Sequence, residues 1–235
     1  MQILAQPMNS NELANIIIAI GALGTASFGL VEASKAFWGG VNRIGFGRIR
    51  TTVSALTPTA GSHNALSQPK IIDTLQANWY NGTDLGSQKA IAKTLIKLNL
   101  SVDNAAALAA VTGVKAGDLQ AIADNIAAGT ELTPAQSDAF GRFDLIVTAL
   151  LDETYQRSDQ AYRNGAKLCA MFASLILAIV AAFLLETPRP HWLDIGKAVM
   201  VGLLATPLAP VAKDLATALN SAVNAMQLVN KKGRA

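Results

Sequence analysis

Residues 168–185 read LCAMFASLILAIVAAFLL, and this stretch decides the fold class. It contains no charged side chain. A helix of a water-soluble protein normally keeps one polar face, whereas a membrane-spanning helix needs roughly 20 mostly apolar residues. The sequence therefore predicts a membrane-spanning helix over residues 166–186.

Two more segments have similar character. Residues 13–31 read LANIIIAIGALGTASFGLV and are followed by Trp38, which suits a membrane interface. We place the first span at residues 13–38. Residues 195–212 form the third apolar segment, so the sequence predicts three transmembrane helices in an all-α integral membrane protein.

The composition agrees with a membrane protein. Hydrophobic residues make up 51% of the chain and charged residues 15%, against roughly 25% charged in an average soluble domain. Aromatic residues are scarce at 6%, which favours close packing of small side chains. The single cysteine, Cys169, excludes a disulfide framework and a thiolate metal site.

Lysine and arginine near the span ends indicate orientation, because cytoplasmic loops carry an excess of both. One side would hold Lys35, Arg43, Arg48 and Arg50 after the first span, Arg157, Arg163 and Lys167 before the second, and Lys231, Lys232 and Arg234 at the C-terminus. We expect a bacterial inner membrane, with residues 1–12 and a hairpin at 187–194 outside and the C-terminus in the cytoplasm. The absence of Lys and Arg from residues 1–12 argues against a cleavable signal peptide. Arg43, Arg48 and Arg50 are the expected contacts to lipid headgroups.

Between the first two spans the sequence predicts a basic juxtamembrane segment and linker over residues 39–69. Its second half is rich in Thr, Ser, Pro and Gly, which are typical of loops. Residues 70–165 then have the hydrophobic period of helices, which predicts a small helical cytosolic domain.

The last helix of this domain has a clear start. Thr133, Pro134 and Gln136 have the spacing of a capping box, and the preceding helix is expected to end at Gly129. No residue stops the new helix before Gly165. The sequence leaves two alternatives open, a single helix over 134–185 or a break at Asn164 and Gly165.

Small residues spaced four apart occur in the first and third spans, as in helix–helix contacts within membranes. They are Gly21, Thr25 and Gly29, and Ala198, Gly202 and Thr206. Such ridges serve packing within one chain or association between copies, and we expect self-association.

Pro207 and Pro210 predict a kink near the end of the third span, because each proline removes a backbone hydrogen bond. Beyond it, residues 213–235 are expected to form an amphipathic helix and a basic tail. The face opposite its apolar stripe is polar but uncharged, which fits contact with another helix or the wall of a wet passage. Its members are Thr217, Asn220, Asn224 and Gln227.

Catalytic and metal-binding motifs are absent from the sequence, so no catalytic, cofactor or metal residues are assigned and no enzyme is expected. Residues 108–126 have a weak helix-turn-helix pattern. Their second helix carries Asp118 and Asp124 but no Lys or Arg after Lys115. Because such a helix needs donors to phosphates and bases, we expect no nucleic-acid partner.

These observations favour a non-enzymatic, oligomeric membrane anchor or scaffold that holds a protein partner through its cytosolic helical domain. The alternative is a homo-oligomeric channel or pore lined by the proline-kinked third helix. The expected partners are membrane lipid, other copies of the chain and a cytosolic protein.

Overall fold

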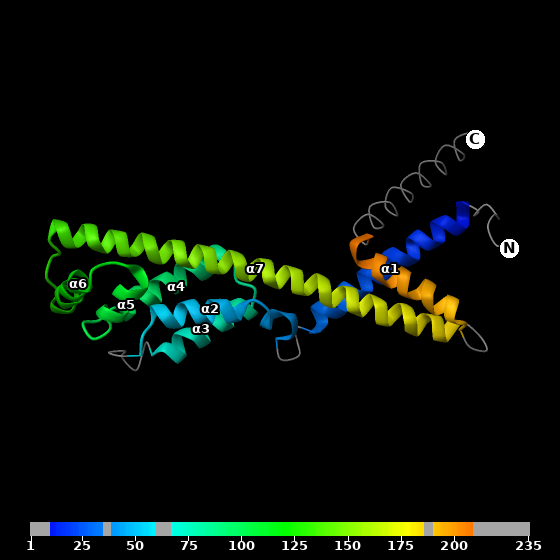
Figure 1. Cartoon of the computed structure of the whole chain (residues 1–235), viewed down its shortest axis with the longest axis horizontal. Helices are drawn as coiled ribbons and strands as arrows, with labels where there is room; N and C mark the ends of the chain where they lie inside the picture. Colours follow the sequence, from blue (N-terminus) through cyan, green and yellow to red (C-terminus); the bar gives the residue numbers. More distant parts are fainter. Residues whose placement is uncertain (1–9, 35–38, 60–66, 186–189, 209–235) are drawn as a thin grey trace, which may run out of the picture. The chain divides into compact units, whose positions relative to one another are not determined.

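The structure is a computed structural model of the 235-residue chain and describes residues 10–34, 39–59, 67–185 and 190–208. These residues form helices, with no strand among them (Figure 1). The predicted all-α class is confirmed. The chain divides into two compact units, unit 1 (Met1–Val41 with Asn164–Ala235) and unit 2 (Asn42–Arg163).

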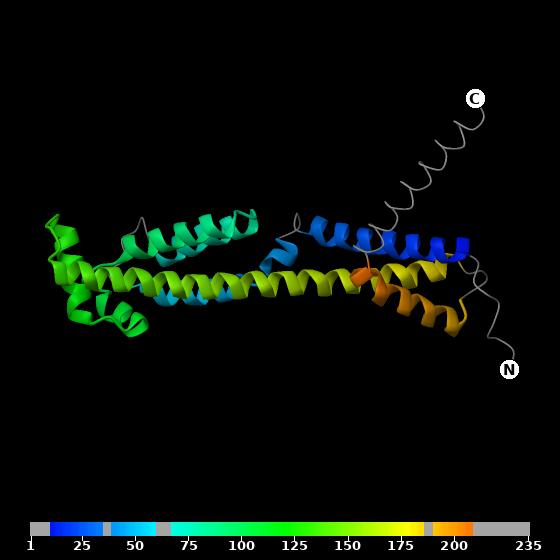
Figure 2. The same ribbon diagram turned by 90° about the horizontal axis from the view of Figure 1, so that it is seen from above.

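Unit 2 is a helical domain built on the first part of a long helix. Figures 1 and 2 show the shorter helices of this unit gathered along that part of α7. Helix α2 packs against α3, α4 and α5, while α5 and α6 form a closely packed pair. The helices are α2 (Phe46–Leu56), α3 (Gln68–Tyr80), α4 (Leu85–Asn99), α5 (Ala105–Thr112), α6 (Ala116–Ala128) and α7 (Pro134–Leu185), and a 3-10 turn, η1 (Gly40–Arg43), precedes them.

One face of α7 supplies much of the unit 2 core. Phe143, Val147, Leu151 and Tyr155 recur every fourth residue and are each at most 1% exposed. This spacing places them in one stripe along the helix, as expected for an amphipathic helix against a core. Each of the remaining unit 2 helices contributes residues to the same cluster, among them Ile49, Leu75, Ile96, Leu108 and Leu119.

The predicted helix boundaries before α7 are confirmed. The Thr133 amide donates to Oε1 of Gln136 at 2.9 Å, and the Gln136 amide donates to Oγ1 of Thr133 at 3.3 Å. This is the reciprocal pair of a capping box. Helix α6 is ended by Gly129, whose φ of 66° is the left-handed conformation that favours glycine.

The segment expected to be a linker, residues 39–69, contains a helix of the unit 2 core. Residues 46–56 are helical, and Phe46, Ile49, Val53 and Leu56 are each at most 4% exposed in the core. The compact unit accordingly begins at Asn42 rather than near residue 70. The threonines and serines of this stretch suggest a loop, but apolar side chains at helical spacing outweigh them once a core is available.

Unit 1 contains α1 (Ser10–Ser34), the last part of α7 and a helix over residues 192–208. Among the residues that the structure describes, two helices are long and apolar enough to cross a membrane, α1 from Ile16 onward and α7. Helix α7 continues without interruption through Asn164 and Gly165. Of the two alternatives left open by the sequence, the structure has the single helix.

The third expected span is only partly described. Residues 192–208 are helical and include Pro207, but the expected span continues to residue 212. A third transmembrane helix therefore stays a prediction. Pro210, the polar face of Thr217, Asn220, Asn224 and Gln227, and the basic tail lie outside the described residues.

Candidate functional site

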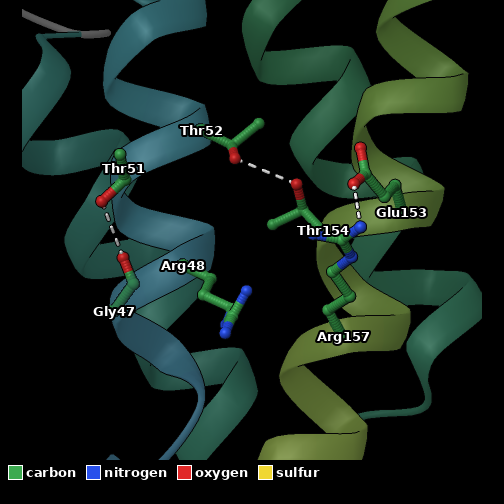
Figure 3. A pocket seen from close by; sticks show the side chains of 7 residues that line it. All are labelled: Gly47, Arg48, Thr51, Thr52, Glu153, Thr154 and Arg157. Carbon is green, nitrogen blue, oxygen red and sulfur yellow. Dashed lines mark hydrogen bonds and ion pairs between the residues drawn. The ribbon is translucent and has the colours of Figure 1, made fainter.

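A cavity of about 330 Å³ lies in unit 2 between the start of α2 and the middle of α7 (Figure 3). Helix α2 contributes Gly47, Arg48, Thr51 and Thr52, and α7 contributes Glu153, Thr154 and Arg157. The lining side chains carry two guanidinium groups, three hydroxyl groups and one carboxylate.

The core faces of the two helices position this lining. Because α2 directs Ile49 and Val53 into the core and α7 directs Leu151 and Tyr155 there, the residues beside these stripes border the gap between the helices. A hydrogen bond of 2.9 Å between the hydroxyls of Thr52 and Thr154 spans that gap (Figure 3).

Gly45 allows α2 to begin close to α7. Its φ is +95°, and a Cβ built there would lie 2.5 Å from the Ser158 carbonyl oxygen. Only glycine fits both the conformation and the space. No side chain caps the first turn of α2, and Gly47 of that turn lines the cavity.

The charges of the cavity do not balance. Arg157 pairs with Glu153 at 3.1 Å, and both side chains are more than half exposed. The Arg48 guanidinium forms no ion pair or hydrogen bond with any part of the chain that the structure describes. Figure 3 shows its guanidinium directed toward the gap. Within the described residues, one arginine of the cavity is thus left without an ion-pair partner.

The three arginines predicted to contact headgroups have different surroundings. Arg43 is exposed at the end of η1. Arg50 lies over the Phe46 ring, 5.7 Å from its centroid, and donates to Oε1 of Gln76 at 3.0 Å. Of the three, only Arg48 lines the cavity.

In the sequence, Arg157 indicates only orientation, and no pattern marks Thr52 or Thr154 as residues of a site. The i, i+4 spacing of Glu153 and Arg157 indicates an exposed face of α7, but only the folded structure brings that face to α2. The sequence signal that could have located the cavity is the helical spacing of apolar residues over 46–56.

Unit 1 brings together part of the third-span ridge. The Ser174 hydroxyl in α7 donates to the Gly202 carbonyl at 2.7 Å and lies 3.2 Å from the Thr206 hydroxyl. A Cβ on Gly202 would lie 2.7 Å from Cα of Leu175. Gly202 and Thr206 therefore form a close contact with α7, and Ala198 is half-buried on the same helix.

The ridge of the first span is placed differently. Thr25 and Gly29 are exposed, and the space around Gly29 is open to 4 Å. The Thr25 hydroxyl donates to the Gly21 carbonyl of its own helix at 2.9 Å. Among the described residues of α1, the buried face holds Ser27 and Val31 instead.

Pro207 lies in the last described turn of its helix. It lines a second cavity, of about 640 Å³, entirely within unit 1. Around it are Phe28, Asn164, Lys167, Leu168, Met171 and Thr206.

Across residues 10–34, 39–59, 67–185 and 190–208, no three His, Cys, Asp or Glu side chains are grouped to hold an ion.

Comparison of the chain with models of known protein families, with curated proteins and with solved structures finds no match.

Proposed function

We propose that this protein is a non-enzymatic membrane anchor or scaffold whose unit 2 holds a protein partner at a membrane surface. The observation that carries the proposal is a reversal of side-chain placement along α7. In unit 2 the helix buries large apolar residues such as Phe143 and Leu151, each at most 1% exposed.

In unit 1 the same helix buries small residues and exposes large apolar ones. Ala170 and Ser174 are fully buried. The exposed positions are Leu168, Phe172, Ile176, Val180, Phe183 and Leu184, at 47% to 76%. Water disfavours so much exposed apolar surface on one helix. Lipid favours it, and small residues are typical of helix contacts inside a bilayer.

The finer topology is part of the proposal. Residues 195–212 form the third span, the N-terminus lies outside a bacterial inner membrane, and unit 2 and the C-terminus are cytoplasmic. The distribution of Lys and Arg in the sequence supports this arrangement.

Partner binding is assigned to unit 2, because it exposes several large apolar side chains that its core does not need. They are Leu98 at 63%, Val111 at 41%, Ile126 at 53% and Leu145 at 71%. Association of copies is assigned to Gly21, Thr25 and Gly29, since Thr25 and Gly29 are exposed. The channel alternative is weaker, because Gly202 and Thr206 of the helix that would line the pore contact Ser174.

Thiol reactivity tests the membrane placement. In a Cys169→Ser background, Ile176→Cys and Leu145→Cys introduce thiols at positions of similar exposure, 61% and 71%. We expect N-ethylmaleimide to label Leu145→Cys in proteoliposomes but not Ile176→Cys, because a thiol in hydrocarbon does not ionise. Both variants should react in SDS. Equal labelling rates in intact vesicles would end the anchor interpretation.

Copurification in mild detergent tests the partner. Leu98→Asp and Leu145→Asp should each remove a bound protein from the purified full-length chain, because a buried unpaired carboxylate weakens an apolar interface. Gln120→Asp, an equally new carboxylate at an exposed position of α6, is the control. If every copurifying protein survives both leucine substitutions, unit 2 does not hold its partner through these residues.

A further inference from the structure

The cavity between α2 and α7 contains the ingredients of an anion site. Two guanidinium groups from helices far apart in sequence line it together with Thr52 and Thr154. The hydroxyl of the third lining threonine, Thr51, donates to the Gly47 carbonyl at 3.0 Å. From these contacts we propose that the cavity binds a phosphoryl group, either of a lipid headgroup or of a small soluble phosphate.

Arginine chemistry favours this ligand. A guanidinium presents several N–H donors in a plane that matches two phosphate oxygens, and such charge-assisted hydrogen bonds are the strong ones. The Arg48 guanidinium has no ion-pair or hydrogen-bond partner in the described part of the chain, so its donors are available. A bound phosphoryl group would offset the mutual repulsion of Arg48 and Arg157.

The hydroxyls and backbone add neutral donors. Thr52 and Thr154 share one hydrogen bond, which uses only one of their two protons and leaves the other for a ligand oxygen. Gly47 lies in the first turn of α2, where amide groups without helical partners favour an anion. A Cβ on Gly47 would meet nothing within 4 Å, so the backbone borders open space on this side.

The negative charge of Glu153 disfavours binding of an anion, and this effect can be tested by substitution. Its carboxylate holds Arg157 at 3.1 Å, but the pair is exposed on one helix, and such pairs are weak. A phosphoryl group with more charge can draw Arg157 away. Removing the carboxylate should therefore strengthen phosphate binding.

The cavity volume is sufficient for a small ligand. At about 330 Å³ it is at the small end of ligand pockets, which suits one phosphoryl group with a small substituent.

In the sequence, Arg48 follows the candidate span in α1 and Arg157 precedes the apolar run from Leu168. A lipid headgroup and a soluble phosphate share the same recognition chemistry.

The experiment uses the full-length chain in nanodiscs. In the first arm the lipid is digalactosyldiacylglycerol alone, which contains no phosphoryl group, and binding of inorganic phosphate is measured by phosphorus NMR. In the second arm phosphatidic acid is added, and native mass spectrometry counts the phosphatidic acid molecules that stay bound. Binding in the first arm identifies a soluble phosphate as ligand, and retention in the second arm alone identifies a headgroup. Either result supports the proposal.

Three variants and one control test whether the measured phosphate or lipid binding occurs in this cavity. Arg48→Gln should weaken binding about tenfold by removing charge-assisted hydrogen bonds. Gly47→Leu should abolish it by filling the cavity, and Glu153→Gln should strengthen it. Arg43→Gln removes the same charge at an exposed position outside the cavity and should have little effect.

Three results would overturn the proposal. The first is no binding in either arm. The second is an equal loss in Arg43→Gln and Arg48→Gln, which would show general attraction of anions to basic residues. The third is unchanged binding in Gly47→Leu. Circular dichroism of each variant confirms that it folds, and all substituted positions are exposed.

Discussion

The hydroxyl of Ser174 in α7 donates a hydrogen bond of 2.7 Å to the carbonyl oxygen of Gly202 in the helix of residues 192–208. The carbonyl is reachable because Gly202 has no side chain, and its Cα region lies against the backbone of Leu175. Close backbone approach and an interhelical hydrogen bond are two of the means by which helices associate in lipid, where no hydrophobic effect drives them together.

Substitutions at this contact should separate the contribution of the hydrogen bond to stability from that of the close backbone approach. Ser174→Ala should lower the free energy of unfolding by about 0.6 kcal/mol, the average for such hydrogen bonds in membranes. Gly202→Ala should cost about 1–3 kcal/mol, because its Cβ would overlap backbone atoms that cannot move aside alone. Unfolding by SDS, followed by circular dichroism of the full-length protein in mild micelles, measures both.

Gly196→Ala provides the matched control for that pair. It makes the same chemical change in the same helix, but nothing lies within 4 Å of the new Cβ. It should leave stability unchanged or slightly higher. An equal loss in Gly196→Ala and Gly202→Ala would mean that the difference in packing between the two glycines has no energetic consequence.

A second prediction compares two glycines at the start of α2. Gly45→Ala should destabilise unit 2 by at least about 2 kcal/mol, because alanine disfavours positive φ and its Cβ would lie 2.5 Å from the Ser158 carbonyl oxygen. Gly47→Ala should instead stabilise it by up to about 1 kcal/mol, since alanine favours helix and the space is open.

Trp79 provides the measurement for unit 2. It is 7% exposed in the core, and its indole N–H donates to the Asn42 carbonyl at 2.7 Å. With Trp38 and Trp192 replaced by Phe, its fluorescence during urea unfolding of the full-length chain in micelles reports unit 2 alone. Loss of stability in Gly47→Ala, or none in Gly45→Ala, would contradict the geometry at the start of α2.

Local chemistry made several features predictable from sequence. The capping box of Thr133 and Gln136, the left-handed stop at Gly129 and the apolar runs of α1 and α7 each depend on residues close together in the chain. Such signals do not require a tertiary structure to be recognised. They were sufficient for the all-α class and for two candidate spans.

Features that depend on remote contacts were not predictable in the same way. Arg48 and Arg157 line one cavity although more than a hundred residues separate them. The period of a helix shows which residues share a face but not which helix that face will meet. For the same reason the spacing of Gly21, Thr25 and Gly29 gave a ridge without showing that Ser27 and Val31 would be buried instead.

A third prediction concerns the buried hydroxyl of Tyr155. The side chain is 1% exposed, and its oxygen has no hydrogen-bond partner within the described residues. Burial raises the pKa of this phenol, which therefore stays neutral. Because an unsatisfied buried polar group is unfavourable, Tyr155→Phe should leave unit 2 as stable or up to about 1 kcal/mol more stable.

Tyr155→Ala is the contrasting variant. It leaves a cavity beside Trp79, whose ring centroid is 6.4 Å from that of Tyr155, and should cost about 3–5 kcal/mol by analogy with other large-to-small aromatic substitutions. A loss above about 1 kcal/mol in Tyr155→Phe would show instead that the hydroxyl has a partner worth one hydrogen bond.

The last prediction is a pH dependence at Asp144. Lys97 and Lys93 donate to its carboxylate at 3.0 and 3.3 Å, and the hydrogen bond from Lys97 is the main cause that lowers its pKa below 3.8. A carboxyl group whose pKa is lower in the folded state stabilises the fold above its unfolded pKa. That stabilisation is lost as the pH falls through the folded pKa.

Asp144→Asn should therefore cost about 1 kcal/mol at pH 7, the scale of a partly exposed ion-pair network, and the cost should shrink as the pH falls below about 4. Asp124→Asn, which removes an exposed carboxylate from α6, should cost little at any pH. Urea unfolding of both variants from pH 7 to pH 3, followed by Trp79 fluorescence, makes the comparison. A cost in Asp144→Asn that stays constant to pH 3 would mean that the carboxylate charge does not act through Lys93 and Lys97.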